Sequence, residues 1–468
     1  MHLSFLPLEE ESRGPGPDLG GTSAIEIAAR HPHLVGQLRR LTGYWSERLS
    51  QKTHLLCQKV GIVGAGLMGC SIAAVLVATG RRVKLVEKDP AAREIALHRV
   101  AYFLSQVERI PHNADCPEDT SKRSRELCEI TDRLAELRDC DLVLECIVES
   151  LPRKKKLLSG LEPLLPPEVV LATNTSSIAV GELAAVLRRP ESFCGIHFLH
   201  PVVKCPVVEV VASQSTAEET LAQAASFLQE LGKLPVPVPD GRGFIVNRIL
   251  FRWFVEALTA LDHGFGRELI EEAARQLGFA WGPLRILDEI GLDLALRVGR
   301  LLQDPLRDPF NLNQRGMRIL SEMIQNQRLG RKTGVGFFSY DSGIPGEGTQ
   351  EGWNAPTFVR HEPPRRSLGQ ESLHGSLTDA LCSRYMLSMA AEALRLIHEN
   401  LVFHPGDIDV LSSFGLGYDA QCGGLLYAAI QRSQSWLSEG LPPEFLPAGM
   451  NLARFKDLAV GLGNVVYD

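Results

Sequence analysis

One stretch without charged side chains limits the fold of this chain more than any other feature. Residues 61–80 read GIVGAGLMGCSIAAVLVATG, a run long enough to cross a bilayer as a single helix. Five of these residues are glycine, and they fall at the spacing of a tight turn. That spacing favours a strand, a turn and a buried helix over a membrane span. We therefore expect no membrane span in this segment.

The glycines have the spacing of a dinucleotide-binding turn, Gly64-Ala65-Gly66-Leu67-Met68-Gly69. In such a turn the first glycine permits the sharp bend, and the second lets the backbone approach a pyrophosphate. The third allows the helix to pack closely on the strand. The N-terminus of that helix offers unpaired N–H groups to the phosphates. The motif alone also fits a glycine turn without a ligand, so the flanking residues must decide.

An acidic residue at the end of the next strand candidate specifies the dinucleotide. Glu87 ends the run RVKLVE, 18 residues after Gly69. At that place a carboxylate accepts hydrogen bonds from the adenine ribose hydroxyls and repels a 2′-phosphate. The residues therefore favour NAD over NADP, whereas the motif by itself also allows FAD.

Short apolar runs and helical stretches alternate through residues 57–240, and this pattern predicts a parallel sheet covered by helices. From GFIVNRILFRWFVEAL (243–258) onward, helical periodicity replaces the strand pattern. We therefore place a domain boundary near Asp240, between an α/β domain and a helical region. The strand candidates are KVGIVGAG, RVKLVEK, CDLVLECIV, VVLATNTS, FCGIHFLHP and VVEVVA.

The other segments follow from composition and periodicity. Residues 1–56 are predicted to form a polar tail and a helix around Ala24–Gln51. A first helical domain is expected over 241–340 and a second over 376–468. Residues 341–375 are rich in glycine, proline and polar residues, which is typical of a linker.

An internal repeat relates the two helical domains. Arg248 and Arg384 each precede a Glu-Ala-Leu triplet by eight residues. Asn247 comes before the first arginine, but Ser383 comes before the second. The difference indicates one active copy and one structural copy. Each copy also reaches a Gly-aromatic pair and a further glycine turn: Gly278-Phe279 with Gly282-Pro283, and Gly417-Tyr418 with Gly423-Gly424.

Composition excludes several classes of function. Of the 468 residues, 44% are hydrophobic and 22% charged, which is typical of a soluble protein with several domains. The net charge of −7 gives no basis for nucleic acid or an anionic membrane as partner. The ten cysteines include no CxxC pair and no zinc-ligand spacing, so we expect reduced thiols and no metal. No targeting signal is evident at either end, which predicts a cytoplasmic location.

Two polar residues interrupt apolar runs close to each other in the sequence. His197 stands in GIHFLHP and Glu209 in VVEVV. Histidine is a base poised near neutral pH, and a buried carboxylate fixes its tautomer and stabilises the imidazolium. The two residues are either one site on neighbouring strands or a core histidine satisfied by a core glutamate. Cys194 and Cys205, which flank them, are interpreted as packing residues.

Together these segments resemble the 3-hydroxyacyl-CoA dehydrogenases of fatty-acid β-oxidation. The matching stretches are GIVGAGLMG, DLVLECIVESLPRKKKL, ATNTSSI, GIHFLHPVVKCPVVEVV, GFIVNR and GRKTGVGFF. The resemblance is strong over about 57–340, and the second helical copy is similar to the dehydrogenase part of the large multifunctional proteins. It implies an α/β Rossmann-type NAD-binding domain followed by two tandem all-α domains of the family's C-terminal type. Residues 1–56 are too few for the enoyl-CoA hydratase domain of those proteins, so we expect the dehydrogenase part alone.

The resemblance assigns catalytic roles residue by residue. His197 is the general base that takes the proton of the 3-hydroxyl while hydride leaves carbon 3 for NAD, and Glu209 holds and polarises His197. Ser176 contacts the substrate and cofactor region, and Asn247 positions the substrate oxygen. On sequence alone, Ser176 could instead belong to a turn and Asn247 to a helix cap.

The resemblance also adds residues to the cofactor site beyond the glycine turn and Glu87. Glu149 and Lys154 line the cofactor and CoA region, and Lys332 reaches the cofactor from the helical domain. A basic run such as RKKK is more typical of a solvated helix face, an alternative that is weaker for Lys154 than for its neighbours. The family usually has Asn, sometimes Ser, at position 200. His200 therefore predicts weaker or pH-dependent NAD binding.

The first interpretation is an enzyme that converts an L-3-hydroxyacyl-CoA and NAD to a 3-ketoacyl-CoA and NADH. Because the second helical copy can pack on the first, we expect either a monomer with an internal pseudo-dimer or a homodimer. A separate hydratase or thiolase is a candidate partner. One alternative is a β-hydroxyacid-type dehydrogenase, which would rely on a lysine in the helical region. The other is a non-catalytic homologue acting in binding or assembly, which His200 favours.

Overall fold

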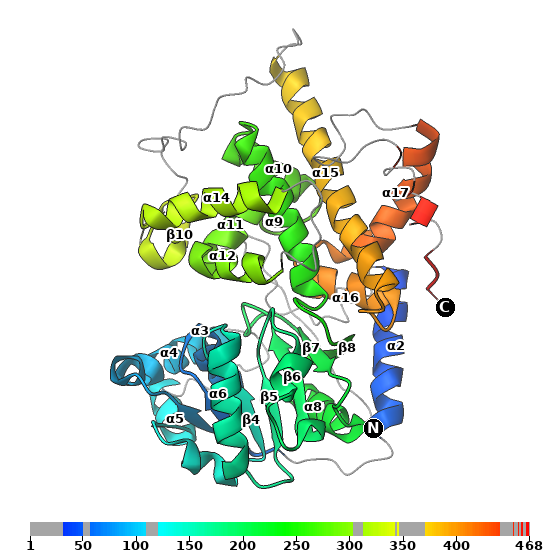
Figure 1. Ribbon diagram of the computed structural model, residues 1–468. Helices are drawn as coiled ribbons and strands as arrows, with labels where there is room; N and C mark the ends of the chain where they lie inside the picture. Colours follow the sequence, from blue (N-terminus) through cyan, green and yellow to red (C-terminus); the bar gives the residue numbers. More distant parts are fainter. Residues whose placement is uncertain are drawn as a thin grey trace. The chain divides into compact units, whose positions relative to one another are not determined.

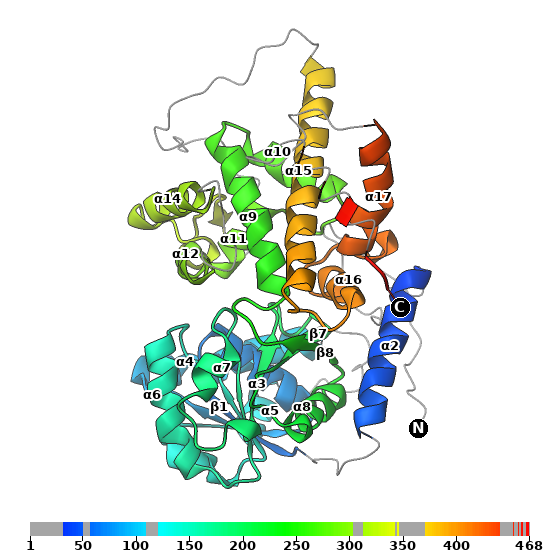
Figure 2. The ribbon, with the colours of Figure 1, turned by 45° about the vertical axis from the view of Figure 1, so that its right-hand side comes forward.

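The chain forms two compact units, residues 1–244 and 245–468 (Figures 1 and 2). The computed structural model describes residues 31–49, 57–108, 120–302, 312–341, 344–345, 370–439, 453, 457, 460–461 and 465–467. The first unit is built on a β-sheet, and the second consists mainly of helices.

An eight-stranded sheet in the order β3-β2-β1-β4-β5-β6-β7-β8 forms the centre of the first unit. All neighbouring pairs are parallel except β6 and β7, which run antiparallel. The wholly parallel sheet expected from the sequence is therefore wrong at this pair, because residues 199–206 are too few for a crossover connection. The strands are β1 (Lys59–Val63), β2 (Arg82–Val86), β3 (Cys128–Thr131), β4 (Leu142–Glu145), β5 (Val170–Thr173), β6 (Phe193–Phe198), β7 (Val207–Ala212) and β8 (Leu234–Pro239).

The two edge strands were missed by sequence reasoning. β8 reads LPVPVP, and proline at every second position argues against a strand because proline has no N–H to donate. The edge position resolves this conflict, since only one side of β8 pairs, in parallel with β7. β3 has only four residues, CEIT, and lies at the opposite edge beside β2.

Helices cover both faces of this sheet (Figures 1 and 2). They are α3 (Leu67–Ala78), α4 (Pro90–Glu108), α5 (Thr120–Leu127), α6 (Leu151–Leu161), α7 (Val180–Ala184) and α8 (Glu218–Glu230), with 3-10 turns η2 (Leu134–Asp139), η3 (Glu162–Leu164) and η4 (Pro190–Ser192). The apolar helix α3 is buried from Gly69 to Val77 and contributes to the core, so the charge-free stretch is a strand, a turn and a helix, as predicted. Among the described helices, none has the length and apolar character needed to cross a membrane.

An N-terminal helix, α2 (Pro32–Leu49), packs on α8. Leu34 and Leu41 are fully buried, and the indole of Trp45 donates a 2.8 Å hydrogen bond to the carbonyl of Pro235 in β8. This helix therefore covers the proline-rich edge of the sheet. The predicted helix over 24–51 also included residues 24–30 and 50–51, which lie outside the described residues.

The second unit contains eight described α-helices: α9 (Val246–Asp262), α10 (Arg267–Gln276), α11 (Pro283–Ile290), α12 (Leu292–Leu301), α14 (Leu312–Gln325), α15 (Gln370–His398), α16 (Pro405–Phe414) and α17 (Leu425–Glu439). Two 3-10 turns, η5 (Arg331–Thr333) and η6 (Ala420–Cys422), and the antiparallel pair β9 (Tyr340–Asp341) and β10 (Ile344–Pro345) complete it. α15 begins inside the stretch expected to be a linker, and residues 346–369 lie outside the described residues.

The two sequence repeats contact each other reciprocally. The guanidinium of Arg248 in α9 donates to Glu392 in α15, and Arg384 in α15 donates to Glu256 in α9 at 2.5 Å. The Gly-aromatic pairs repeat the pattern: Ala280 N–H donates to Gly417 O and Asp419 N–H to Gly278 O, at 3.1 and 2.8 Å. Each kind of contact is thus made twice, once from the first repeat to the second and once from the second to the first, as in a two-fold arrangement. The repeated segments pack on each other within one chain, as expected.

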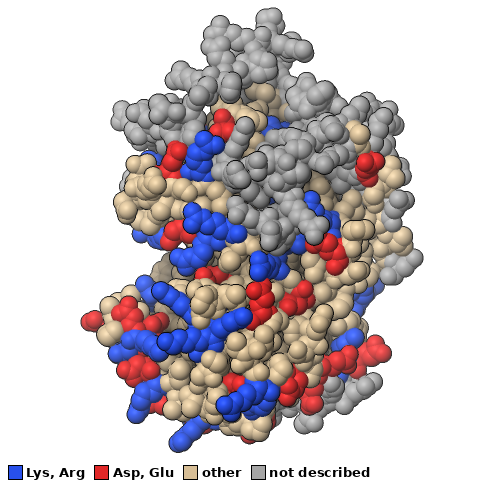
Figure 3. All heavy atoms as spheres, in the orientation of Figure 1, with Lys and Arg blue, Asp and Glu red and all other residues tan. Residues whose placement is uncertain are grey.

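Basic and acidic side chains are interspersed on the face of the molecule shown in Figure 3. Among the described residues, Lys59 and Lys84 both pair with Asp139, at 2.5 and 2.9 Å. Such exposed pairs contribute little to stability, so the buried contacts described above determine the fold.

Candidate active site

The glycine turn joins β1 to α3 at the edge where the strand order changes direction, between β1 and β4. Gly64 has φ +111°, and a Cβ there would lie 2.7 Å from the carbonyl of Cys146. A Cβ at Gly69 would lie 1.9 Å from the carbonyl of Gly64, so this glycine allows the helix to approach the turn. A Cβ at Gly66 would meet nothing within 4 Å. The second glycine therefore faces open space, where a phosphate could approach the backbone.

Glu87 directly follows β2, beside this turn. Its carboxylate accepts a 2.9 Å hydrogen bond from Ala65 N–H and a 3.0 Å bond from Asp89 N–H. Each carboxylate oxygen can accept two hydrogen bonds. These two bonds therefore orient Glu87 and leave it able to accept further hydrogen bonds. Two large apolar side chains flank the turn in exposed positions, Leu67 at 50% and Val148 at 51% exposure, while Met68 packs against the core.

His197 and Glu209 meet at the antiparallel strand pair. Their residues lie directly opposite each other in the register of β6 and β7. His197 Nδ1 is 2.6 Å from Glu209 Oε2, and the two side chains are 6% and 0% exposed. Because Nδ1 faces the carboxylate, Nε2 is the ring nitrogen available for other chemistry. The prediction that these two residues form one pair on neighbouring strands is confirmed.

Further contacts hold the histidine in place. The ring of Phe244 lies 5.6 Å from that of His197, and Phe244 has φ +49°, which is uncommon for a bulky residue. The side chain of Asn174, just after β5, accepts a 2.9 Å hydrogen bond from Phe198 N–H. The end of β5 is thus tied to the residue that follows His197.

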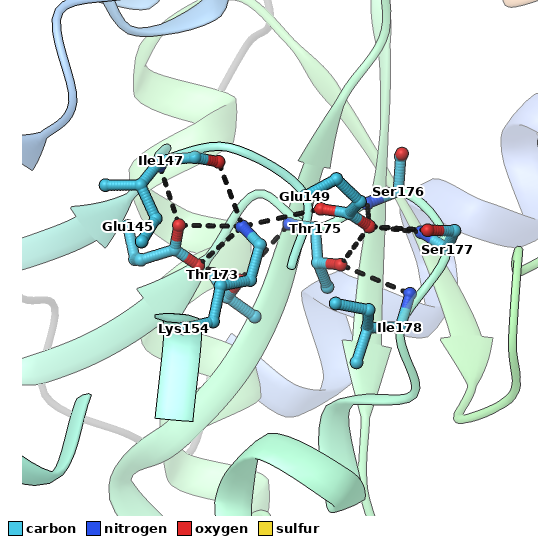
Figure 4. Close-up of polar contacts among 9 residues, drawn as sticks. All are labelled: Glu145, Ile147, Glu149, Lys154, Thr173, Thr175, Ser176, Ser177 and Ile178. Atoms are coloured by element: carbon cyan, nitrogen blue, oxygen red, sulfur yellow. Dashed lines mark hydrogen bonds and ion pairs between the residues drawn. The ribbon is translucent and has the colours of Figure 1, made fainter. Parts of the chain in front are cut away.

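Glu149 organises the NTSS segment after β5 (Figure 4). One oxygen, Oε1, accepts from the hydroxyls of Thr175 and Ser177 at 2.6 Å each. The same oxygen accepts from the backbone N–H groups of Ser176 and Ser177 at 3.2 and 2.9 Å. The hydroxyl of Ser176 points away from Glu149 in Figure 4, and the residue is half-buried.

Lys154 is buried and lies at the centre of a second set of contacts. Its ammonium donates to both carboxylate oxygens of Glu145, at 2.7 and 2.9 Å, and lies 3.5 Å from Glu149. Burial opposes its charge, but the carboxylates of Glu145 and Glu149 outweigh that effect and raise the pKa of Lys154. Burial also opposes the charge of Glu149, yet Lys154 and the donors at Ser177 and Thr175 lower its pKa. Arg153 and Lys156, beside it in RKKK, are exposed.

The loop between β6 and β7 begins with an exposed His200, followed by a cis peptide bond to Pro201. The buried ammonium of Lys233 donates to the carbonyls of Val202 and Cys205, at 2.7 and 2.8 Å. This lysine, just before β8, therefore fixes the loop whose two ends carry His197 and Glu209.

The cysteines near the site are buried packing residues. Burial raises the pKa of Cys194 to about 12 and that of Cys205 to about 11, so neither is a reactive thiolate. The nine described cysteines are free thiols. Within the described ranges, no group of three or more histidine, cysteine or acidic residues is placed to bind a metal ion.

Asn247 and Lys332 lie in the second unit. Asn247 is half-buried in the first turn of α9. Lys332 in η5 pairs with Asp293. The segment after η5 is fixed by buried Asp288, which accepts from the N–H groups of Phe337 and Phe338 at 2.8 and 2.9 Å. The contacts predicted for Asn247 and Lys332 with substrate and cofactor stay predictions.

Comparison with known proteins identifies the family. Residues 59–241 match the family model "3-hydroxyacyl-CoA dehydrogenase, NAD binding domain", and residues 243–340 match that of the C-terminal domain. The (S)-3-hydroxybutyryl-CoA dehydrogenase PaaH1 from Ralstonia eutropha is 33% identical, with coverage of 61% of this chain and 100% of that chain and a TM-score of 0.54. The chain belongs to the 3-hydroxyacyl-CoA dehydrogenase family. Its first domain is the family's NAD-binding domain.

Two further relatives extend beyond residue 340. The fatty acid oxidation complex subunit alpha of Shewanella sp. (strain MR-4) is 30% identical over 379 residues, 78% of this chain and 50% of that protein. The chain thus spans about half the length of the curated relatives it matches. The 3-hydroxybutyryl-CoA dehydrogenase from Escherichia coli K12 has a similar fold over 87% of this chain and 100% of its own, with 22% identity and a TM-score of 0.64.

Proposed function

We propose that the protein oxidises L-3-hydroxyacyl-CoA to 3-ketoacyl-CoA with NAD as the hydride acceptor, a reaction of fatty-acid β-oxidation. The observation that carries the proposal is the buried contact of 2.6 Å between His197 and Glu209 at the end of the sheet. It supplies a base whose tautomer and orientation are fixed. The family models and the relatives support the same reaction.

His197 Nε2 accepts the proton of the 3-hydroxyl. Glu209 keeps Nδ1 protonated, so Nε2 has a lone pair to accept that proton, and then stabilises the imidazolium that forms. Bound NAD supplies the acceptor for the hydride that leaves carbon 3. The carbon–oxygen bond becomes a carbonyl as the two hydrogens leave, one as a proton on His197 and one as hydride.

Residues around the glycine turn fit the dinucleotide. The open space at Gly66, at the N-terminus of α3, supports a pyrophosphate there, and Glu87 beside the turn is proposed to accept from the adenine ribose. His200 and Lys332 are proposed to complete the site near the nicotinamide ribose and from the second unit.

Ser176 and Asn247 are proposed to bind the substrate. The hydroxyl of Ser176 points away from Glu149, and this direction supports a role toward the ligand (Figure 4). Asn247 opens α9 in the first repeat, where the second repeat has Ser383. The first copy is therefore the one proposed to act on substrate.

The proposal extends to the helical region, which we infer to be two tandem copies of the C-terminal-type domain. The reciprocal bonds between α9 and α15 and the paired segments at Phe279 and Tyr418 support it. The two helical domains cover each other's contact surfaces within one chain. A second chain is not needed to cover those surfaces, which favours a monomer.

The experiment is NADH formation from NAD with L-3-hydroxyacyl-CoAs of short, medium and long chain. His197→Ala is the matched control, with NAD binding measured separately for both proteins. We expect turnover in the wild type that the control abolishes while it still binds NAD. No turnover at any chain length despite NAD binding would favour a non-catalytic homologue instead.

A further inference from the structure

Glu145 is a fully buried carboxylate at the end of β4, outside the set of residues expected to form the site. Its Oε1 accepts from Ile147 N–H and from Lys154 Nζ, both at 2.7 Å. Its Oε2 accepts from Lys154 Nζ at 2.9 Å and from the hydroxyl of Thr173 at 2.7 Å (Figure 4). A buried carboxylate with so many donors is a structural centre rather than an isolated core residue.

We propose that Glu145, paired with Lys154, is a positioning residue of the dehydrogenase site. Together they fix two loops, residues 146–150 after β4 and 174–178 after β5, in one arrangement. The first loop borders the glycine turn, and the second carries Ser176. The inference rests on the proposed function only for the consequence on turnover.

The first loop is fixed directly. Glu145 binds Ile147 N–H, and Lys154 Nζ donates to Ile147 O at 3.3 Å, so one residue is held at both its polar groups. Cys146, between them, donates its N–H to Val63 O at 2.8 Å and abuts Gly64. A shift in this loop would therefore move the wall against which the dinucleotide turn packs.

The second loop is fixed through Thr173 and Glu149. The hydroxyl of Thr173 donates to Glu145 and accepts from Thr175 N–H at 3.2 Å. Thr175 then donates its own hydroxyl to Glu149 and accepts from Ile178 N–H at 3.2 Å. The hydrogen bonds thus run on both sides of Ser176.

The ammonium of Lys154 is held inside this network. Its three hydrogens are matched by its contacts with Glu145 and Ile147. The predicted contact of Lys154 with the cofactor or CoA stays a prediction. Replacing a buried ion pair by apolar residues of similar volume often leaves a protein equally stable. We therefore assign the Glu145–Lys154 pair the role of holding the two loops in one conformation.

The experiment compares Glu145→Gln, Lys154→Met and the double variant, with Lys156→Met on the exposed face of α6 as control. The readouts are the melting temperature, the Kd for NAD without substrate, and kcat and KM separately. Each single variant removes one charge from this buried cluster and should lower the melting temperature. The double variant still buries the charge of Glu149 without its cation. Both the double variant and Glu145→Gln, which keeps Lys154, should raise the Kd for NAD or a KM about ten-fold or more. The control should match the wild type.

A double variant with wild-type stability, Kd and KM would overturn the proposal. Should the charge variants fail to fold, Thr173→Val removes only the hydroxyl that joins Glu145 to the second loop. It should raise the KM for acyl-CoA, and an unchanged KM would also overturn the proposal. A wild type without turnover, combined with a raised Kd in the double variant, would refute the proposed reaction but not the positioning role.

Discussion

Glu209→Gln keeps the size of the side chain and removes its charge. Opposite charges about 4 Å apart attract by about 4 kcal/mol at an effective dielectric constant near 20. The 2.6 Å contact between Glu209 and His197, with the carboxylate fully buried, is at least that close. Losing that stabilisation of the imidazolium corresponds to about a thousand-fold lower kcat. The amide can also donate to Nδ1, which would place the proton on Nε2 and block the base.

The assay is NADH formation under saturating NAD and acyl-CoA, with KM measured for both. We expect kcat to fall by about a thousand-fold while KM changes little, because Glu209 contacts the histidine and not the substrate. Circular dichroism and NAD binding establish that the variant is folded. A variant that is folded and turns over at the wild-type rate would remove Glu209 from the mechanism and refute this reasoning.

Three further predictions concern the cofactor and stability. His200→Asn should tighten NAD binding and reduce its pH dependence, measured as Kd from pH 6 to 8. Burial lowers the pKa of Lys233 to about 8, so the folded protein releases this proton before the unfolded chain does. In denaturant titrations, the free energy of unfolding of the wild type should therefore rise from pH 8 to 10 relative to that of Lys233→Met. Burial raises the pKa of Glu271 to about 7, so the folded protein keeps this proton to a higher pH than the unfolded chain does. The free energy of unfolding of the wild type should therefore fall as pH rises from 5 to 7, and Glu271→Gln should lack this fall.

Local sequence signals were enough to predict the glycine turn and the contact between His197 and Glu209. The glycine spacing requires a bend with positive φ at Gly64, and this requirement is local. His197 and Glu209 stood out because each replaces an apolar residue in a strand. The short connection between them allowed only adjacent strands, and their opposition in the register follows from it.

The missed features depend on tertiary context. β8 was not predicted because its prolines are tolerated only at an edge, and edge position is a property of the whole sheet. Glu145 ends an apolar strand just as Glu87 does, and that parallel could have drawn attention to it. Its role depends on Lys154 reaching back from α6 and on Thr173 in the adjacent strand, which no spacing in the sequence reveals.

The central claim is that His197 takes the hydroxyl proton while the hydrogen on carbon 3 leaves as hydride. The most direct measurement is turnover of an L-3-hydroxyacyl-CoA deuterated at carbon 3, with the isotope followed by mass spectrometry. The account predicts one deuterium in each NADH formed by the wild type and no labelled NADH from His197→Ala. Equal labelling in both proteins would show that another group is the base, and unlabelled NADH from the wild type would contradict the hydride transfer itself.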